Sequence, residues 1–250
     1  MRGIFVGIVA GAMLASAAAL AAGVPAYVSA AVADKGRPAE DVKRDADRKP
    51  TDMVVFAGIK PGDVVVDLIP GRGYFTRIFA KAVGPKGRVY AFYPSELDAT
   101  FKKFGVPIPS GTDPNCPNVY YLHSPVAKFV VPEMADVVWT SQNYHDMHDP
   151  FMGPQDLVAV NKAIYAALKP GGTYIVLDHA AAAGSGVRDT DTLHRIDPAV
   201  VKQEVLAAGF KFVGEDDVLR NPNDSHDKAV FDASIRGHTD QFIFKFKKPR

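Results

Sequence analysis

The sequence contains little cysteine and no excess of charge of either sign. Cys116 is the only cysteine, so the chain cannot form an internal disulfide. Its 29 Lys and Arg residues nearly balance its 28 Asp and Glu residues, which leaves a formal net charge of +1. Proteins that follow a phosphate backbone carry a basic stripe and a marked positive excess. We therefore expect no nucleic-acid partner.

Long apolar runs are also lacking, apart from one at the amino end, Gly3–Ala22, and Arg2 is the only charge before Asp34. Two small-residue motifs, Val-Ser-Ala and Ala-Val-Ala, then precede the charged part of the chain. This order is typical of a signal peptide. We predict a signal peptide over residues 1–33, export to the periplasm or medium, and no stable membrane anchoring after cleavage. An uncleaved anchor is the alternative, because the run approaches the ~20 residues that span a bilayer.

The remaining chain is long enough for one sizeable core, since 47% of the 250 residues are hydrophobic. The segment 34–49 is densely charged and predicts a linker or an exposed helix with a solvated face. From Pro50 onward, helical and strand patterns alternate. The continuous β-branched run Val64–Leu68 is typical of a parallel strand covered on both faces.

The alternation predicts one doubly wound α/β domain over residues 50–250, with ligands beyond the carboxyl ends of its strands. Helices are predicted at residues 50–57, 74–83, 95–104, 156–168 and 198–208. Strands are predicted at residues 64–68, 88–93, 119–122, 135–140, 173–178, 210–213 and 241–246.

The turn after the first strand, in the stretch VVVDLIPGRGYF, holds Gly71 and Gly73 immediately before a predicted helix. Glycines at this place let the backbone approach a ligand at a helix N-terminus. A dinucleotide fingerprint requires a third glycine where Thr76 stands. The turn therefore disfavours a nicotinamide or flavin dinucleotide.

The run from Asp67 to Tyr74 resembles the first motif of class I S-adenosylmethionine-dependent methyltransferases, in which an acid precedes glycines at alternate positions. Residues 87–97, 135–149 and 168–179 resemble the second, fourth and fifth strands of that family. The chain is most similar to exported bacterial methyltransferases of unassigned substrate. The resemblance implies a single Rossmann-like domain with a mostly parallel seven-stranded sheet and an antiparallel last strand.

The resemblance also implies S-adenosylmethionine as the cofactor. The residues that it points to for cofactor binding are Asp67, Gly71, Gly73, Tyr74 and Tyr93. By this likeness the two glycines give the amino-acid part of the cofactor access to the backbone. The carboxylate of Asp67 anchors the loop or reaches the amino group of the cofactor.

Three positions depart from the family pattern. Ile69 replaces a glycine, Tyr93 replaces the acid that accepts the ribose hydroxyls, and Ser124 stands where an acid often accepts from adenine. Glu96 or Asp98 is a candidate replacement for the ribose acid. Charged hydrogen bonds contribute roughly 1.5 to 3 kcal/mol each, so losing two predicts binding weakened by about 10² to 10⁴ fold.

Histidines gather in the loops that follow the predicted fourth and fifth strands. His145 and His148 follow the fourth strand, and Asp178 and His179 end the fifth, so we expect them around one pocket. The candidate catalytic residues are Tyr144 and His145, which would orient or deprotonate an acceptor. The imidazole of His145 suits proton transfer because imidazole titrates near neutral pH. No cysteine lies nearby and the spacing matches no recognised metal pattern, so no metal site is assigned.

Three functions are compatible with these features. The first is methyl transfer from S-adenosylmethionine to an unidentified small-molecule acceptor. The second is an exported, non-catalytic ligand-binding protein that keeps the methyltransferase fold. The third is a metal-dependent hydrolase that uses His145, His148 and His179.

Overall fold

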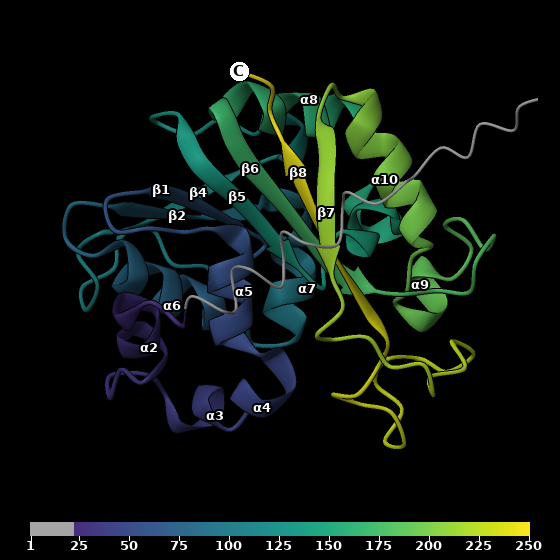
Figure 1. The fold of residues 1–250 in the computed structure, drawn as a ribbon. Helices are drawn as coiled ribbons and strands as arrows, with labels where there is room; N and C mark the ends of the chain where they lie inside the picture. The colour runs from purple at the N-terminus through teal and green to yellow at the C-terminus, as the bar shows by residue number, and fades with distance from the viewer. Residues whose placement is uncertain (1–22) are drawn as a thin grey trace, which may run out of the picture.

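The computed structural model describes residues 23–250, so most of the predicted signal peptide, residues 1–22, lies outside the described residues. Its centre is an eight-stranded sheet in the order β3-β4-β2-β1-β5-β6-β8-β7 (Figure 1). The strands are β1 (Val64–Leu68), β2 (Arg88–Pro94), β3 (Gly111–Thr112), β4 (Val119–Ser124), β5 (Ala135–Ser141), β6 (Leu168–His179), β7 (Lys211–Asp216) and β8 (Gln241–Lys247).

Most neighbouring strands are parallel, as predicted. β1 pairs in parallel with β2 and β5, β2 with β4, and β5 with β6. β8 is antiparallel to both β6 and β7, so it is the antiparallel last strand. The seven predicted strands are all present, and the eighth, β3, adds two residues antiparallel to β4 at the sheet edge. β6 begins at Leu168 and not at the predicted Thr173.

Helices cover both faces of the sheet (Figure 1). On one face lie α2 (Ala26–Val32), α5 (Pro50–Ala57) and α6 (Tyr74–Val83). On the other lie α7 (Asp98–Lys103), α8 (Leu157–Ala167) and α10 (Pro198–Ala207). The shorter helices are α3 (Ala39–Val42), α4 (Asp45–Arg48) and α9 (Thr190–Leu193), with 3-10 turns η1 (Ser95–Leu97), η2 (Val126–Lys128), η3 (His145–His148) and η4 (Pro150–Met152).

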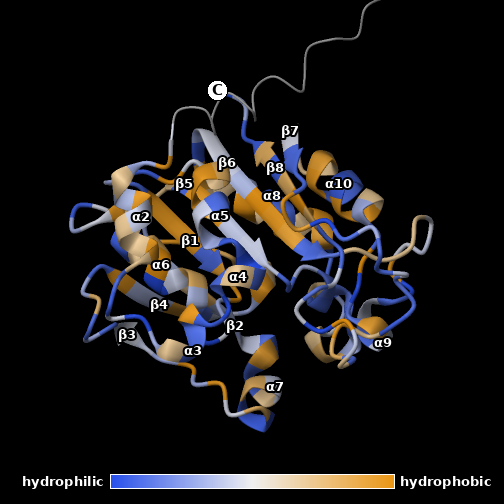
Figure 2. Ribbon diagram, turned by 60° about the horizontal axis from the view of Figure 1, so that its bottom comes forward, coloured by the Kyte–Doolittle hydropathy of each residue, from blue (hydrophilic) through white to orange (hydrophobic). Residues whose placement is uncertain are grey.

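The core consists of two apolar layers, one on each face of the sheet. Val64, Val66 and Leu68 of β1 belong to the layer under α8 and α10, whereas Val65 belongs to the layer under α5 and α6. Every residue of β1 is buried, as expected for a continuous apolar strand between two helical layers. In Figure 2 the ribbon of β1 is coloured as apolar.

Helix α2 is part of this core. Its Val28 and Ala31 are buried, and the hydroxyl of Tyr27 donates to the carbonyl of Ile59 at 2.9 Å. A signal-peptide boundary at residue 33 would therefore remove a core helix. Within residues 23–250, no helix is both long enough and apolar enough to span a bilayer.

The charged segment 34–49 folds against the domain as α3 and α4. Arg37 and Asp41 are buried, and the Arg37 guanidinium donates to both carboxylate oxygens of Asp45, at 2.6 and 2.8 Å. Asp41 accepts from Arg77 of α6 at 2.9 Å. The interpretation of this segment as a solvated face is therefore wrong for Arg37 and Asp41, because specific ion pairs replace the water that charged groups otherwise require.

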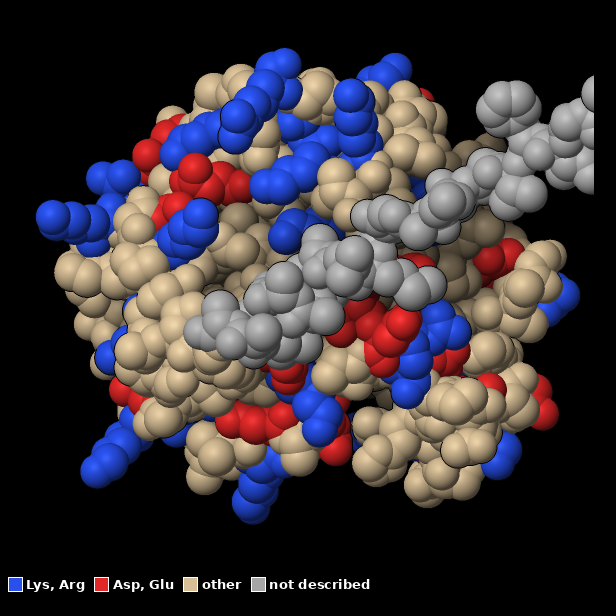
Figure 3. Space-filling view, viewed as in Figure 1, with Lys and Arg blue, Asp and Glu red and all other residues tan. Residues whose placement is uncertain are grey.

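Charged side chains are unevenly spread over the surface. In Figure 3, Lys and Arg side chains gather along the upper edge, near the carboxyl terminus, whereas both signs mix in the lower part. That upper edge is where β6 begins, because Thr173 of β6 pairs with Lys247 near the end of β8. The basic edge therefore lies at the amino ends of the parallel strands, away from their carboxyl ends.

Candidate functional site

A cavity of about 370 Å³ lies at the carboxyl ends of β1 and β5. The turn between β1 and α6 contributes Asp67, Ile69 and Gly71 to its wall, and Asn143 comes from the segment after β5. Arg48 of α4 also lines it, so the folded charged segment forms one side of the cavity. The cavity therefore occupies the place where ligands bind in doubly wound sheets.

The glycine turn has three residues in the left-handed backbone region. The φ angles are 59° at Ile69, 56° at Gly71 and 78° at Gly73. Glycine adopts this conformation freely, whereas a β-branched residue is a genuine outlier there. Two hydrogen bonds hold Ile69: its N–H donates to the Phe92 carbonyl at 2.9 Å, and its carbonyl accepts from Asn143 at 3.0 Å. The turn thus keeps a glycine-like backbone at the position where the sequence has isoleucine.

Asp67 is buried at the start of this turn. Its carboxylate accepts from the Thr76 hydroxyl at 2.6 Å, so the residue at the third glycine position anchors the acid. Burial raises the pKa of Asp67 to about 6, because the charged form loses its hydration. At neutral pH the cavity therefore presents a carboxylate.

Arg48 places a positive charge on the same cavity. Its guanidinium donates to Ser141 at 3.2 Å and to Gln142 at 2.9 Å, and it lies 4.7 Å from the centre of the Tyr74 ring. Burial lowers the pKa of Arg48 to about 10, which still leaves it charged at neutral pH. Tyr74 also lines the cavity, and its hydroxyl donates to Asp45 at 2.6 Å. Sequence reasoning missed Arg48 because the segment that carries it was interpreted as solvated.

Tyr93 is separated from the Asp67 cavity. Its buried side chain lines a smaller hollow of about 210 Å³ together with Gly73, and its hydroxyl donates to the Gly71 carbonyl at 3.2 Å. The phenol therefore stabilises the glycine turn from outside the Asp67 cavity.

Neither predicted replacement for the ribose acid lines the Asp67 cavity or the hollow beside Tyr93. Glu96 accepts from the Val126 N–H at 3.1 Å, and Asp98 lies 2.8 Å from the His123 ring nitrogen. Both carboxylates are thus engaged with residues of the following strand and turn.

Tyr144 is completely buried and lines none of the cavities described above. Its hydroxyl donates to Glu204 at 2.7 Å and accepts from Asn161 at 2.8 Å, and burial raises its pKa well above the usual value. This placement argues against the predicted catalytic role of Tyr144, because a phenol inside the core cannot reach an acceptor. His148 contacts the same Glu204 at 3.2 Å.

His145 and Asp178 are in contact, although neither lines the cavities described above. The Nδ1 of His145 lies 2.8 Å from Asp178, which also accepts from the His145 backbone N–H at 2.8 Å. Burial alone would lower the pKa of His145, but the charges of Asp178 and Asp146 raise it to about 9. The ring centre of His179 lies 6.3 Å from that of His145, but the Nδ1 of His179 lies 2.7 Å from the Thr239 hydroxyl, and burial lowers the pKa of His179 to about 3. Among the described residues, His148 and His179 do not join His145 in a set of side chains that could hold one metal ion.

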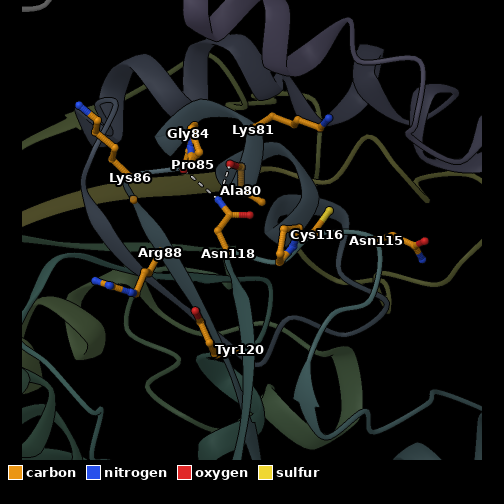
Figure 4. Close-up of a pocket in the computed structure, with 12 residues that line it drawn as sticks. Ala80, Lys81, Gly84, Pro85, Lys86, Arg88, Asn115, Cys116, Asn118 and Tyr120 are labelled. Atoms are coloured by element: carbon orange, nitrogen blue, oxygen red, sulfur yellow. Dashed lines mark hydrogen bonds between the residues drawn. The ribbon is translucent and has the colours of Figure 1, made fainter.

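A further cavity, of about 440 Å³, lies at the amino ends of β2 and β4 (Figure 4). The Asn118 amide on its wall donates to the carbonyls of Ala80 and Gly84, at 2.9 and 3.1 Å, and so ties the end of α6 to the sheet. The Asn118 amide is thus used for structure. The cavity also lies at the end of the sheet opposite to the usual ligand position.

No protein-family model matches the chain. The ubiquinone/menaquinone biosynthesis C-methyltransferase UbiE of Hydrogenovibrio crunogenus is 30% identical over 128 residues, which cover 50% of this chain and 45% of that relative. The match therefore spans less than half the length of the curated relative.

Solved structures resemble the whole domain. A SAM-dependent methyltransferase from Aquifex aeolicus has 18% identity and a TM-score of 0.53, covering 86% of this chain and 100% of that one. The arsenic(III) S-adenosylmethionine methyltransferase of Chlamydomonas reinhardtii has 17% identity and a TM-score of 0.52, covering 90% and 74%. The cyclase SpnF has 19% identity and a TM-score of 0.56, covering 82% of each chain. These likenesses confirm the class I methyltransferase fold, and the cyclase illustrates that the fold alone does not fix the reaction.

Proposed function

We propose that this chain, which has the class I methyltransferase fold, binds S-adenosylmethionine and transfers its methyl group to a small acceptor. The observation that carries the proposal is the cavity of about 370 Å³ bounded by the Gly71 turn, Asp67 and Asn143. It combines a glycine turn, a carboxylate and a polar strand end at the position where this fold binds ligands.

The charges around the cavity suit the zwitterionic methionine end of the cofactor. The Asp67 carboxylate is an acceptor for the ammonium group, and the Arg48 guanidinium is a donor for the carboxylate. Both side chains line the same cavity and are largely shielded from water, where charge-assisted hydrogen bonds are strongest. This complementarity supports a bound amino acid more directly than a bound phosphate, which Asp67 would repel.

The ribose end of the cofactor has weaker support. The carboxylates of Glu96 and Asp98 are engaged elsewhere, and the Tyr93 hydroxyl already donates to Gly71. One charged hydrogen bond less costs roughly 1.5 to 3 kcal/mol, and two weaken binding by about 10² to 10⁴ fold. We therefore expect this chain to bind S-adenosylmethionine more weakly than a protein that has both acids.

In such a transfer the cofactor supplies an electrophilic methyl group on a sulfonium sulfur. The task of the protein is to align the acceptor with the methyl carbon and sulfur, a positioning effect that requires no catalytic triad. Asp67, Arg48 and the Gly71 backbone would hold the cofactor in this alignment.

Export is the second part of the proposal and rests on the apolar run of residues 3–22. Because α2 belongs to the core, the mature chain is proposed to keep residues 26–32, and the signal peptide to end before them. Cleavage after Ala21 satisfies this condition, since Ala19-Leu20-Ala21 is a small-residue motif of the required type.

Calorimetric titration of the purified chain from residue 23 with S-adenosylmethionine and with its demethylated product tests the proposal. Gly71→Ala adds a methyl group that meets no protein atom within 4 Å and therefore projects into open space at the turn. Gly153→Ala is the matched control, because its φ of 68° is similar and its surroundings are equally open, but it lies after η4. Backbone strain is thus comparable in the two variants.

We expect wild type and Gly153→Ala to bind both ligands, and Gly71→Ala to bind at least about tenfold more weakly, a loss of about 1.4 kcal/mol. Absence of heat from the wild type at millimolar ligand would reject methyl transfer and leave the ligand-binding alternative. Equal affinities of the two variants would place the cofactor away from the turn.

A further inference from the structure

We propose that His145, Asp146 and His194 bind a divalent transition-metal ion. Within residues 23–250, this is the only group of His, Cys, Asp and Glu side chains whose ligand atoms all lie within 4.8 Å of one another. None of the three residues lines the proposed cofactor cavity, and the inference stands whether or not the chain transfers methyl groups.

The distances between the three ligand atoms fit a single ion. The Nε2 of His145 lies 3.3 Å from the Nδ1 of His194 and 3.3 Å from the Oδ1 of Asp146. The third separation, between His194 and Asp146, is 3.9 Å. Ligands bound at about 2.0 to 2.2 Å in tetrahedral geometry lie about 3.3 to 3.6 Å apart. A small rotation of the partly exposed Asp146 carboxylate closes the remaining gap.

The surroundings of His145 are those of a metal-ligating histidine. Its second ring nitrogen, Nδ1, lies 2.8 Å from the completely buried Asp178 carboxylate. Asp178 is itself fixed, because it accepts from the backbone N–H groups of His145 and His179, at 2.8 and 2.7 Å. Such a carboxylate sets the tautomer and the ring orientation, and it keeps Nε2 directed toward His194 and Asp146.

An unpaired buried carboxyl group in the same loop gives independent support. Asp149, which follows η3, is completely buried, and neither of its carboxyl oxygens has a hydrogen-bond partner among the described residues. It adds a further carboxyl group to those of Asp146 and Asp178. A bound cation would offset the cost of burying these groups in their ionised form.

The group can also be reached from solvent. The side chains of Asp146 and His194 are 18% and 27% exposed, whereas that of His145 is 4% exposed. An ion can therefore enter from the side of Asp146 and His194. His194 has a φ of 53°, the left-handed conformation that commonly ends a helix, here α9.

The donor set indicates the class of metal. Two imidazoles and one carboxylate suit zinc, iron(II), cobalt(II) and similar ions, whereas calcium and magnesium prefer oxygen ligands. Three protein ligands leave at least one position open for water or an oxygen donor of a small ligand. His194 stands 49 residues from His145, which explains why no spacing motif revealed the set.

The test is titration of the chelator-treated chain with Co²⁺, followed by visible absorption, and with Zn²⁺, followed by calorimetry. His194→Asn removes the imidazole while keeping a residue that tolerates the left-handed backbone, and Asp146→Asn removes the charge. His148→Ala is the control, because this imidazole lies in the same turn but contacts Glu204. Circular dichroism and thermal melting establish that each variant folds.

We expect one ion per chain in wild type and in His148→Ala, with a raised Tm by mass action. His194→Asn and Asp146→Asn should each bind at least about tenfold more weakly. Absence of a cobalt band and of zinc heat in the folded wild type would overturn the proposal. So would unchanged affinity in His194→Asn, or an equal loss in His148→Ala.

Discussion

The strained backbone at Ile69 gives a stability prediction that depends only on the conformation of the turn. An L-residue in the left-handed region costs roughly 1 to 2 kcal/mol, a penalty that glycine escapes. The φ of 59° at Ile69 should therefore make Ile69→Gly unusually stable compared with Ile69→Ala. Both substitutions remove the same side chain beyond Cβ, so their difference isolates the backbone and the Cβ itself.

Val66 supplies the reference, because it is equally buried but lies in the extended backbone of β1. There, glycine should be less stable than alanine, since glycine loses more conformational freedom on folding. The Gly-minus-Ala difference should be about 1 to 2 kcal/mol more favourable to glycine at position 69 than at position 66. Only the left-handed penalty distinguishes the two sites.

Urea unfolding of the four variants, followed by tryptophan fluorescence and circular dichroism, measures this double difference. If each variant unfolds in one cooperative transition with an unchanged m-value, the four urea midpoints are directly comparable. The same Gly-minus-Ala difference at both positions would refute the reasoning. It would mean that Ile69 is not held in the left-handed region in solution.

Three further predictions follow from the site and from α2. Affinity for S-adenosylmethionine should rise about tenfold per pH unit up to about pH 6 and then level off, because Asp67 must lose its proton to accept the ammonium group. Calorimetry from pH 4.5 to 8 checks this, and an affinity that does not change with pH would contradict it. Tyr93→Phe should weaken binding by up to about tenfold, because the phenol holds the Gly71 carbonyl of the turn; the same titration measures this, and unchanged affinity would show that the phenol does not support the site. A chain that starts at residue 34 should have a free energy of unfolding about 3 kcal/mol lower than one that starts at residue 23. The loss comes from the burial of Val28 and Ala31 and from the Tyr27 hydrogen bond. Equal urea midpoints of the two chains would speak against α2 as a core helix.

The fold was predictable because its main signals are local. The bounds of α6 and β1 agree with the sequence patterns, since a helix with one apolar face and a short β-branched run have distinct periods. β3 was missed because two residues carry no periodicity. The start of β6 was misplaced because Lys169, Pro170 and two glycines resemble a turn. Leu168 before them already pairs with Ala135, and the register is irregular between Leu168 and Thr173.

The site was only partly predictable, because its polar groups depend on distant partners. The place of the Gly71 turn follows from the order of strand, glycine and helix. The burial of Arg37 and Asp41 does not, since it requires Asp45 and Arg77 in specific positions. For the same reason the charged segment gave no sign that Arg48 would line the cavity. Charge patterning indicates exposure on average, and ion pairs between elements override it.

The histidines show the same limit. The meeting of His145 with Asp178 follows from the parallel order of β5 and β6, whose carboxyl ends lie side by side. The role of Tyr144 was misjudged because the residue lies in the right loop but its side chain turns into the core toward Glu204. Loop position alone does not tell which side chain faces the cavity.

The central claim is that the cavity beside Gly71 holds the methionine end of S-adenosylmethionine. A crystal structure of the chain from residue 23, grown with the demethylated product of the cofactor, tests this most directly. The account predicts density in the cavity, with the amino group within hydrogen-bond distance of Asp67 and the carboxylate on Arg48. Ligand density in the cavity beside Asn118, or an Asp67 cavity that stays empty at millimolar ligand, would contradict it.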